Sequence, residues 1–259
     1  MDKLQQLRER IARCGSLCVA YSGGADSSLV VHLAHEALGD KALAVLVDSP
    51  VLARRDREAA IEILQKLGAR YLVVEENPFV SQEFTANSRR RCYFCKKSCY
   101  ALILQIARRE GITLVADGQN ADDFRSPYRP GIQAARELGV ISPLADCAMG
   151  KDEVRQYSLL LGIVTWNKPA NACLSSRIPY GEAITPERLS LIEAAEEVLR
   201  RRKMEGCRVR WHQNIARIEA PRKYFDTLVN TPEIALEIKA LGFQYITLDL
   251  EGFRSGSMN

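Results

Sequence analysis

LCVAYSGGADSS, residues 17–28, is the stretch that decides the fold of this 259-residue chain. A short apolar strand runs into a glycine-rich turn, and a helix follows the turn. Gly23 and Gly24 can adopt backbone angles that other residues avoid, so consecutive N–H groups can turn toward a bound oxyanion. The positive end of the helix adds to this attraction. The stretch therefore predicts an anion site between a strand and a helix.

The polar residues of the same stretch indicate which anion is bound. Ser22, Ser27 and Ser28 supply hydroxyl groups, and Asp26 can lie beside phosphate if a Mg²⁺ ion bridges them. The loop lacks the lysine of the G-x-x-x-x-G-K-[ST] pattern. As S-G-G-x-D-S after a strand, it resembles the PP-loop of ATP pyrophosphatases, which split ATP between the α and β phosphates. An ordinary strand-to-helix turn is the alternative interpretation.

The composition is that of a globular protein, with 47% hydrophobic and 26% charged residues. No apolar run approaches the roughly 20 residues that span a membrane, and the amino end is charged, so we expect a cytoplasmic protein without a membrane partner. The net charge of +4 suits phosphate-bearing substrates but falls short of a nucleic-acid-binding pattern. Eight cysteines in such a chain favour metal, redox or nucleophilic chemistry over disulfides.

Alternating strands and helices predict an α/β fold with a parallel sheet. Strands are expected at 17–21, 42–48, 70–75, 112–116 and, briefly, 140–144. Helices are expected at 1–14, up to 38, and at 53–67, 95–109 and 151–161, with a polar loop at 81–91. Ligands bind at the carboxyl ends of such strands, which is where the sequence places Asp48, Asp117, Asn120, Asp122 and Asp123. Each of these residues also suits an ordinary turn.

The chain is expected to form two domains, 1–165 and 187–259. The link between them, 166–186, is rich in proline, lacks a periodic pattern and carries Cys173. Thr185 is a candidate cap for a helix at 186–203. Strands at 208–211, 216–220 and 245–250 and a helix at 232–241 then predict a small α+β domain.

Cys92 and Cys95 form a C-x-x-C pair directly after three arginines, 89–91. This spacing lets two thiolates meet one metal, and the arginines favour thiolate. Cys173 is a candidate third ligand, and three cysteines leave one position open, which suits an iron–sulfur cluster that binds an exogenous sulfur. A structural metal, or a thiol pair without metal, is the alternative. The other cysteines are expected to be packing residues: Cys14, Cys18, Cys99, Cys147 and Cys207.

A cluster of arginines is the third candidate site. Arg208 and Arg210 alternate on one strand, so both guanidinium groups can point at one anion, and Arg177 is grouped with them. A solvated sheet face explains the strand arginines equally well. Glu193, Glu196 and Glu197 are expected on the solvated side of their helix.

Five stretches together resemble the LarE family, the PP-loop ATP-dependent sulfur transferases of nickel-pincer cofactor synthesis: SGGADSS, RCYFCK, DGQNADDFRSPYRPG, ACLSSRIPYG and GFQYITLDLEGFRSGSMN. The resemblance extends from about residue 17 to the carboxyl end. It implies a PP-loop ATP pyrophosphatase domain of the HUP-like Rossmann type with a smaller C-terminal α+β domain. It also implies ATP and Mg²⁺ as cofactors, and homo-oligomers that are often hexamers.

The resemblance implies a definite reaction. ATP adenylates a carboxylate of pyridinium-3,5-biscarboxylic acid mononucleotide, pyrophosphate leaves, and sulfur then displaces AMP to give a thiocarboxylate. Family members with a single cysteine at the position of Cys173 give up its sulfur. Members with the additional C-x-x-C hold a [4Fe-4S] cluster on three cysteines and pass on a bound sulfide. Because Cys92, Cys95 and Cys173 are all present, the cluster-dependent version is favoured, and sacrifice of Cys173 is the alternative.

The site residues follow by motif. We expect ATP and Mg²⁺ at Ser22, Gly23, Gly24, Asp26, Ser27, Ser28 and Asp48, and the substrate at Arg177, Arg208, Arg210, Asp122 and Asp123. A tRNA thiolase with a cluster is a rival, but it needs a broad basic surface with aromatic residues, so a small nucleotide is the expected partner. A regulatory module that binds nucleotide without turnover is another rival, and it leaves the cysteines unexplained.

Overall fold

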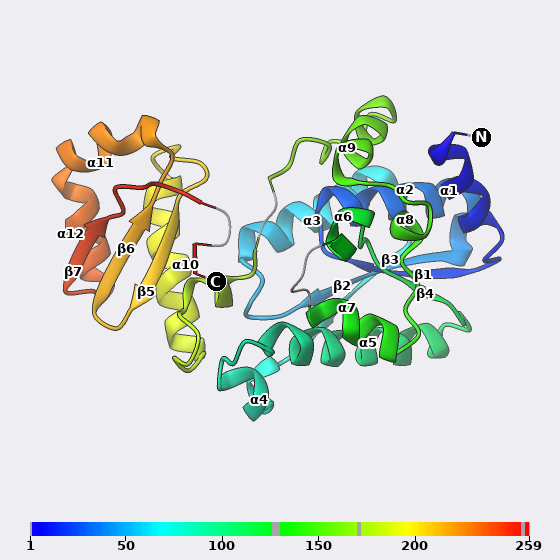
Figure 1. Ribbon diagram of the computed structural model, residues 1–259, viewed down its shortest axis with the longest axis horizontal. Helices are drawn as coiled ribbons and strands as arrows, with labels where there is room; N and C mark the ends of the chain where they lie inside the picture. Colours follow the sequence, from blue (N-terminus) through cyan, green and yellow to red (C-terminus); the bar gives the residue numbers. More distant parts are fainter. Residues whose placement is uncertain (1, 126–129, 170–171, 255–256, 259) are drawn as a thin grey trace. The chain divides into compact units, whose positions relative to one another are not determined.

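The computed structural model describes residues 2–125, 130–169, 172–254 and 257–258 (Figure 1). The chain divides into two compact units. The first consists of Met1–Pro78 and Arg90–Asn171, and the second consists of Phe79–Arg89 and Ala172–Asn259. Parts of two expected segments, residues 126–129 of the acidic loop and 170–171 of the link, lie outside the described residues, as do 255–256 and 259 of the tail.

The first unit is built on a four-stranded parallel sheet with the order β3-β2-β1-β4. The expected PP-loop-type α/β fold is thereby confirmed. The glycine-rich loop follows β1, which lies between β2 and β4, so the loop sits at the middle of the carboxyl edge of the sheet. The strands are β1 (Leu17–Tyr21), β2 (Ala42–Asp48), β3 (Tyr71–Glu75) and β4 (Val115–Ala116).

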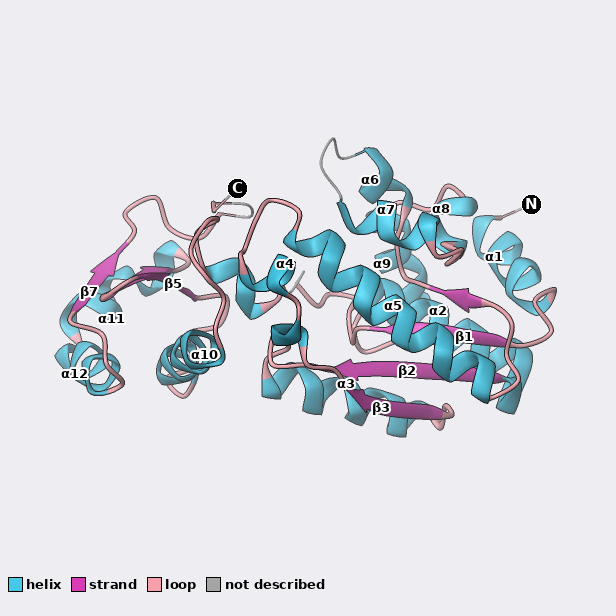
Figure 2. Ribbon diagram, turned by 90° about the horizontal axis from the view of Figure 1, so that it is seen from below, coloured by secondary structure: helices cyan, strands magenta, loops and turns pink. Residues whose placement is uncertain are grey.

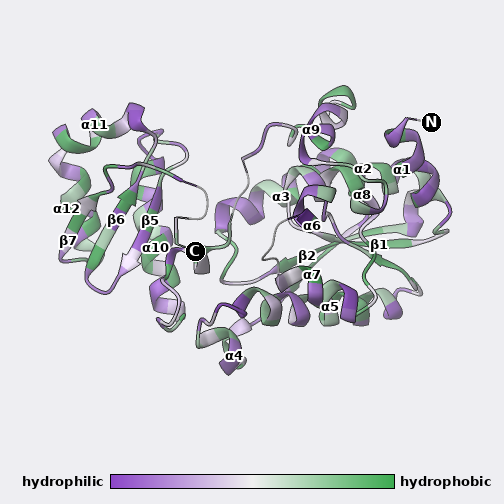
Figure 3. Ribbon diagram, in the orientation of Figure 1, coloured by the Kyte–Doolittle hydropathy of each residue, from purple (hydrophilic) through white to green (hydrophobic). Residues whose placement is uncertain are grey.

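Helices cover both faces of this sheet (Figure 2). One apolar cluster packs Leu17 and Val19 of β1 against α1, α2, α3 and α9. The other packs Cys18 of β1 and Leu43 of β2 against α5 and α7. β1 and β2 therefore have apolar side chains on both faces, which is typical of a buried parallel sheet. Figure 3 colours the residues of the sheet by their hydropathy. The helices are α1 (Lys3–Ala12), α2 (Ala25–Leu38), α3 (Arg54–Leu67), α5 (Arg91–Arg109), α6 (Ala121–Arg125), α7 (Pro130–Glu137), α8 (Pro143–Asp146) and α9 (Lys151–Leu160), with the 3₁₀ turn η1 (Gly39–Lys41).

The second unit has a three-stranded sheet with the order β5-β6-β7, in which β5 is antiparallel and β7 parallel to β6. The Thr185 hydroxyl accepts a hydrogen bond from the backbone N–H of Arg188, which confirms the expected cap of α10. The elements are η2 (Pro78–Val80), α4 (Gln82–Thr85), η3 (Leu174–Arg177), α10 (Pro186–Arg200), β5 (Arg208–His212), β6 (Ile215–Glu219), η4 (Arg222–Tyr224), α11 (Phe225–Asn230), α12 (Pro232–Ala240) and β7 (Tyr245–Leu248).

The segment 79–89, expected in the first domain, groups with the second unit. The reason is the buried side chain of Asn87, whose amide donates to the carbonyl oxygens of Pro179 and Glu182 at 2.7 Å each. The Ile184 N–H also donates to the carbonyl of Thr85 at 2.9 Å. These bonds join stretches about ninety positions apart in sequence.

Four expected elements differ in the structure. The loop at 81–91 contains α4, and α5 begins at Arg91 rather than 95, because buried Tyr93 packs in the second apolar cluster. The expected strand at 112–116 is reduced to β4, because the N–H of Ile112 donates to the carbonyl oxygen of Ala107 at the end of α5. Strand 140–144 is reduced to one bridge between Ala116 and Ile141, and α8 follows with proline in its first turn. Among the described residues, no helix is both long and apolar enough to cross a membrane.

Candidate nucleotide and sulfur-transfer site

Only one glycine of the loop has the unusual backbone angle that the sequence predicts, because Gly24 has a φ of −86° and a ψ of 165°, which any residue can adopt. Gly23 has a φ of +70°, and a Cβ atom there would lie 2.6 Å from Cβ of Ala60 on α3. Gly24 precedes the first turn of α2, and within the described chain no side chain caps that turn. The amides at the amino end of α2 are therefore available to an anion, and only glycine fits at position 23.

The serines of the loop divide into two kinds. The Ser22 side chain is exposed, whereas Ser27 and Ser28 are buried. The Ser27 hydroxyl accepts the N–H of Ser22 at 3.2 Å, and the Ser28 hydroxyl contacts that of Tyr21 at 3.5 Å. Ser27 and Ser28 thus fix the shape of the loop, and the exposed Ser22 hydroxyl lies 3.1 Å from that of Ser27.

Two lysines from distant parts of the first unit reach this loop. The Lys151 ammonium lies 2.5 Å from a carboxylate oxygen of Asp26, and Lys168 donates to the carbonyl oxygen of Gly23 at 2.9 Å. Burial lowers the pKa of Lys168. Together they place two cationic side chains at a loop that contains no lysine of its own, which favours a polyanion such as triphosphate.

Asp48, at the carboxyl end of β2, is held by Arg57 from the first turn of α3. Its carboxylate oxygen lies 2.5 Å from Nε of Arg57, and both side chains are partly exposed. Asp48 therefore lies at the carboxyl end of its strand, as expected, with an arginine partner that the sequence did not indicate.

Asp117, at the end of β4, is buried and fully engaged inside the first unit. Its carboxylate accepts hydrogen bonds from the hydroxyls of Tyr100 and Ser142, at 2.8 Å each, and from the side chain of Gln119. The next residue, Gly118, lies against the loop, since a Cβ there would lie 2.6 Å from the backbone nitrogen of Ser27. The backbone of this stretch therefore packs against the first turn of α2.

The acidic residues that follow have structural contacts. Asn120 donates to a carboxylate oxygen of Asp26 at 3.2 Å and so reaches the loop directly. Asp122 accepts the N–H of Lys151 at 2.7 Å, and Asp123 accepts the N–H of Asn120 at 3.1 Å. Asp122 therefore caps the helix whose first residue, Lys151, contacts Asp26.

The C-x-x-C pair lies in the first two turns of α5. Cys92 is exposed and Cys95 is half-buried. One turn further on, Cys99 lies on the same face, and a hydrogen bond from the Cys95 thiol lowers the pKa of Cys99. The expectation that Cys99 is only a packing residue is thus incomplete, because its thiol contacts a candidate ligand.

Cys173 is exposed and belongs to the second unit, where it precedes the 3₁₀ turn η3. In the residues that the structure describes, no three cysteine, histidine or acidic side chains form a group that could hold a metal ion.

Burial raises the pKa of the thiols of Cys18 and Cys207 to about 12, as expected of packing residues. Burial likewise raises the pKa of Cys14 and Cys147.

Arg208 and Arg210 have different surroundings in the second unit. Arg210 is buried, and its guanidinium donates to the buried carboxylate of Glu219 at 2.7 Å. Arg217, the cross-strand neighbour of Arg210, binds the other oxygen of Glu219 at 3.1 Å. The Arg208 guanidinium instead lies 5.5 Å from the centre of the Phe253 ring. The charge of Arg210 is thus compensated within the protein.

The comparisons with known proteins agree with this geometry. An uncharacterised protein of Synechocystis is 44% identical to this chain over the whole of this chain and 97% of its own length. The pyridinium-3,5-bisthiocarboxylic acid mononucleotide synthase of Lactiplantibacillus plantarum is 37% identical over 93% of this chain and 88% of that enzyme. The chain belongs to the LarE family. Residues 2–100 also match the NAD synthase family, another PP-loop family. As a LarE-family protein, the chain is an ATP-dependent sulfurtransferase.

Sequence reasoning missed several residues around the LarE-family loop. Lys151 and Lys168 stand far from it in sequence, and Arg57 lies within an ordinary amphipathic helix. The one available signal was the absence of a lysine inside the loop, which leaves the phosphate charge to be balanced by residues from other elements.

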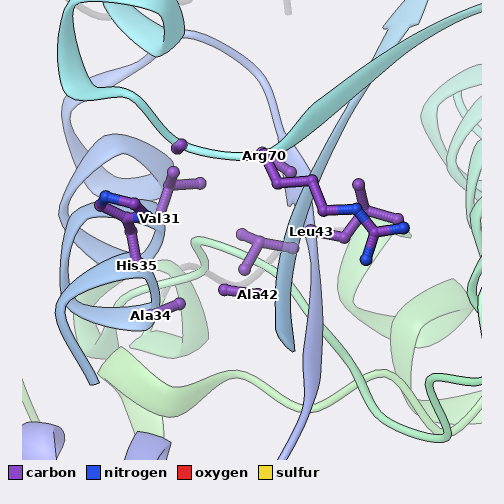
Figure 4. Close-up of a pocket in the computed structure, with 9 residues that line it drawn as sticks. Val31, Ala34, His35, Ala42, Leu43 and Arg70 are labelled. Atoms are coloured by element: carbon purple, nitrogen blue, oxygen red, sulfur yellow. The ribbon is translucent and has the colours of Figure 1, made fainter. Parts of the chain in front are cut away.

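A separate pocket lies beside the amino end of β2. Figure 4 shows the residues that line it. It is lined mainly by apolar residues of α2 and β2, among them Val31, Ala34 and Leu43, with His35 and Arg70 at its edge. Ala42, which also lines it, begins β2, whereas the glycine-rich loop follows the end of β1. The pocket therefore does not belong to the nucleotide site.

Proposed function

We propose that this protein converts the carboxylates of pyridinium-3,5-biscarboxylic acid mononucleotide to thiocarboxylates, for the nickel-pincer cofactor, at the expense of ATP. The observation that carries the proposal is the loop after β1, with its uncapped helix end and the ammonium groups of Lys151 and Lys168 beside it. The similarity to the Lactiplantibacillus plantarum synthase supplies the substrate class.

The loop residues account for the first half of the reaction. The amides at the start of α2 and the hydroxyl of Ser22 would bind the phosphates of ATP, and the Asp26 carboxylate would hold Mg²⁺. A substrate carboxylate oxygen attacks the α-phosphorus, the bond to the β-phosphate oxygen breaks, and pyrophosphate leaves. Lys151 and Lys168 balance the charge that develops on pyrophosphate. The acyl-adenylate is then open to a sulfur nucleophile, which releases AMP.

The sulfur step rests on the cysteines. Thiolates are the usual ligands of iron–sulfur clusters, and exposed Cys92, half-buried Cys95 and exposed Cys173 fit that donor chemistry. We propose these three as ligands of a [4Fe-4S] cluster, which would supply a bound sulfide for transfer. A cytoplasmic location and assembly into homo-oligomers belong to the same proposal.

The substrate contacts also remain proposals. Arg208 of β5 is the arginine we assign to the substrate phosphate, because the guanidinium of Arg210 on the same strand is bound to Glu219. Asp122 and Asp123 would act by shaping the loop near the nucleotide, because their carboxylates bind backbone N–H groups.

Purification without oxygen tests the cluster directly. Iron and sulfide should accompany the native protein, should be lost in Cys92→Ala and should remain in the matched control Cys14→Ala, which changes a cysteine of the turn between α1 and β1. Iron-free protein that still transfers sulfur, with loss of one sulfur atom from Cys173, would replace the cluster by sacrifice of that cysteine.

The adenylation step has its own assay. Pyrophosphate release should require both ATP and pyridinium-3,5-biscarboxylic acid mononucleotide and should persist in Cys173→Ala, because that thiol acts only after adenylation. ATP binding without pyrophosphate release would instead indicate a regulatory nucleotide-binding module.

A further inference from the structure

Arg177 is a buried residue of η3, with 4% of its surface exposed. Its guanidinium makes a two-pronged ion pair with Glu196 of α10. Nε lies 2.9 Å from one carboxylate oxygen, and Nη2 lies 3.2 Å from the other. Such parallel bonds fix both the position and the plane of the guanidinium.

The third nitrogen of Arg177 faces the chain around Cys173. Nη1 donates to the carbonyl oxygen of Ala172 at 2.5 Å and to that of Cys173 at 3.0 Å. It also contacts the Ser176 hydroxyl at 3.0 Å. The peptide groups on both sides of the Cys173 Cα atom are thus bound to one buried cation, while the Cys173 side chain stays exposed.

Glu196 is itself anchored to the sheet. The same oxygen that accepts Nε of Arg177 also accepts the backbone N–H of Val209 on β5, at 3.1 Å. Glu196 is therefore not on the solvated side of its helix, as the sequence had indicated, but joins α10, β5 and η3. This arrangement ties the backbone at Cys173 to the core of the second unit.

We propose that Arg177 is a positioning residue for Cys173, which it holds through the two flanking carbonyl groups, and that it is not a ligand of the substrate. The inference rests on the role that the proposed function gives to Cys173. All three guanidinium nitrogens already have partners within the second unit. A substrate anion would have to compete with the carboxylate of Glu196.

Hydrogen exchange of the free protein tests this role without any substrate. In Arg177→Lys the single ammonium cannot span Glu196 and both carbonyls. Loss of a charged hydrogen bond should speed amide exchange in peptides covering 173–178 by about tenfold or more. Peptides from α10 and β5 should keep their rates. The matched control is Arg188→Lys, on α10 of the same unit, which should leave 173–178 unchanged.

Kinetics of the same variants give the second readout. Arg177→Lys should lower kcat for sulfur transfer and leave both pyrophosphate release and the KM for the nucleotide substrate near their native values. Unchanged exchange with a raised KM would overturn the proposal in favour of a substrate ligand. Faster exchange throughout the second unit would also overturn it, because Arg177 would then be a general core residue. If the native protein transfers no sulfur, the proposed function fails, while the exchange result still decides whether Arg177 holds the backbone.

Discussion

The ammonium of Lys151 and the carboxylate of Asp26 lie 2.5 Å apart, although 125 positions separate them in the chain. Asp26 lies in the first turn of α2, directly after the glycine-rich loop, and Lys151 is the first residue of α9. Asp122 accepts the backbone N–H of Lys151 and so holds the start of that helix in place. The loop thus receives from another element the cation that its own sequence lacks.

Replacing Lys151 should impair adenylation. Lys151→Met removes the ammonium group that would balance the negative charge of the leaving pyrophosphate. Removal of one group that stabilises a transition-state charge typically lowers kcat by about 10²–10³. Pyrophosphate release at saturating ATP measures the effect. Lys66→Met, which removes an exposed lysine paired with Glu62 on α3, is the control and should match the native enzyme. A native kcat in Lys151→Met would rule out this role.

ATP should protect Lys168 from acylation. Burial lowers the pKa of Lys168, so a larger share of its amine is neutral and nucleophilic than in an exposed lysine. Bound triphosphate favours the charged form, and each unit of pKa rise lowers the neutral share about tenfold. Mass spectrometry after brief acetylation, with and without ATP and Mg²⁺, measures this at Lys168. The exposed Lys41 should react equally in both samples, and equal reaction at Lys168 would contradict the assignment.

Gly118→Ala should weaken both stability and ATP binding. The added methyl group would lie 2.6 Å from the backbone nitrogen and 2.9 Å from Cα of Ser27, so the start of α2 must shift. Overpacking of this kind costs about 1–3 kcal/mol. In the control Gly131→Ala, the methyl group would meet only the flexible side chain of Lys96, at 3.2 Å. Denaturant unfolding and the KM for ATP should change in the first variant alone. An equal loss in both would show that the contact with α2 is unimportant.

The stability of the second unit should fall in mild acid because of His212. Burial, and then the nearby Arg217 cation, lower the pKa of His212 below its usual 6.5, while Glu219 opposes them. The unfolded chain therefore binds a proton that the folded chain excludes, so stability is lost as pH falls below the unfolded value and is regained above it. Denaturant unfolding across this range should show the loss when it is followed by Trp211 fluorescence in a Trp166→Phe background, which removes the tryptophan of the first unit.

His212→Gln should flatten that pH dependence. His32, in the first unit, also has a pKa lowered by burial, so His32→Gln serves as the comparison. The His32 variant should leave the pH dependence of the Trp211 signal as it is. A profile that is the same in His212→Gln as in the native protein would assign the acid loss to other groups.

Much of the fold followed from local patterns. The strands at 17–21 and 42–48 match β1 and β2, because a continuous apolar run bounded by turn residues is typical of a buried parallel strand. The cap at Thr185 could also be predicted, since a capping side chain accepts a hydrogen bond from a backbone N–H only three positions away. The weakest predictions were the short edge segments at 112–116 and 140–144, where a few apolar residues do not distinguish strand from turn.

The sequence by itself determined the shape of the glycine-rich loop, since Gly23 has a positive φ and α2 begins two residues later. It also determined the candidate thiols, because the residue type alone fixes the functional group of a side chain. Only the tertiary structure decided the partners: Lys151 with Asp26, and Arg177 with Glu196. The physical reason is that a salt bridge between distant segments leaves no periodic trace along the chain. Its partners meet only when the packing of strands and helices has brought their backbones together.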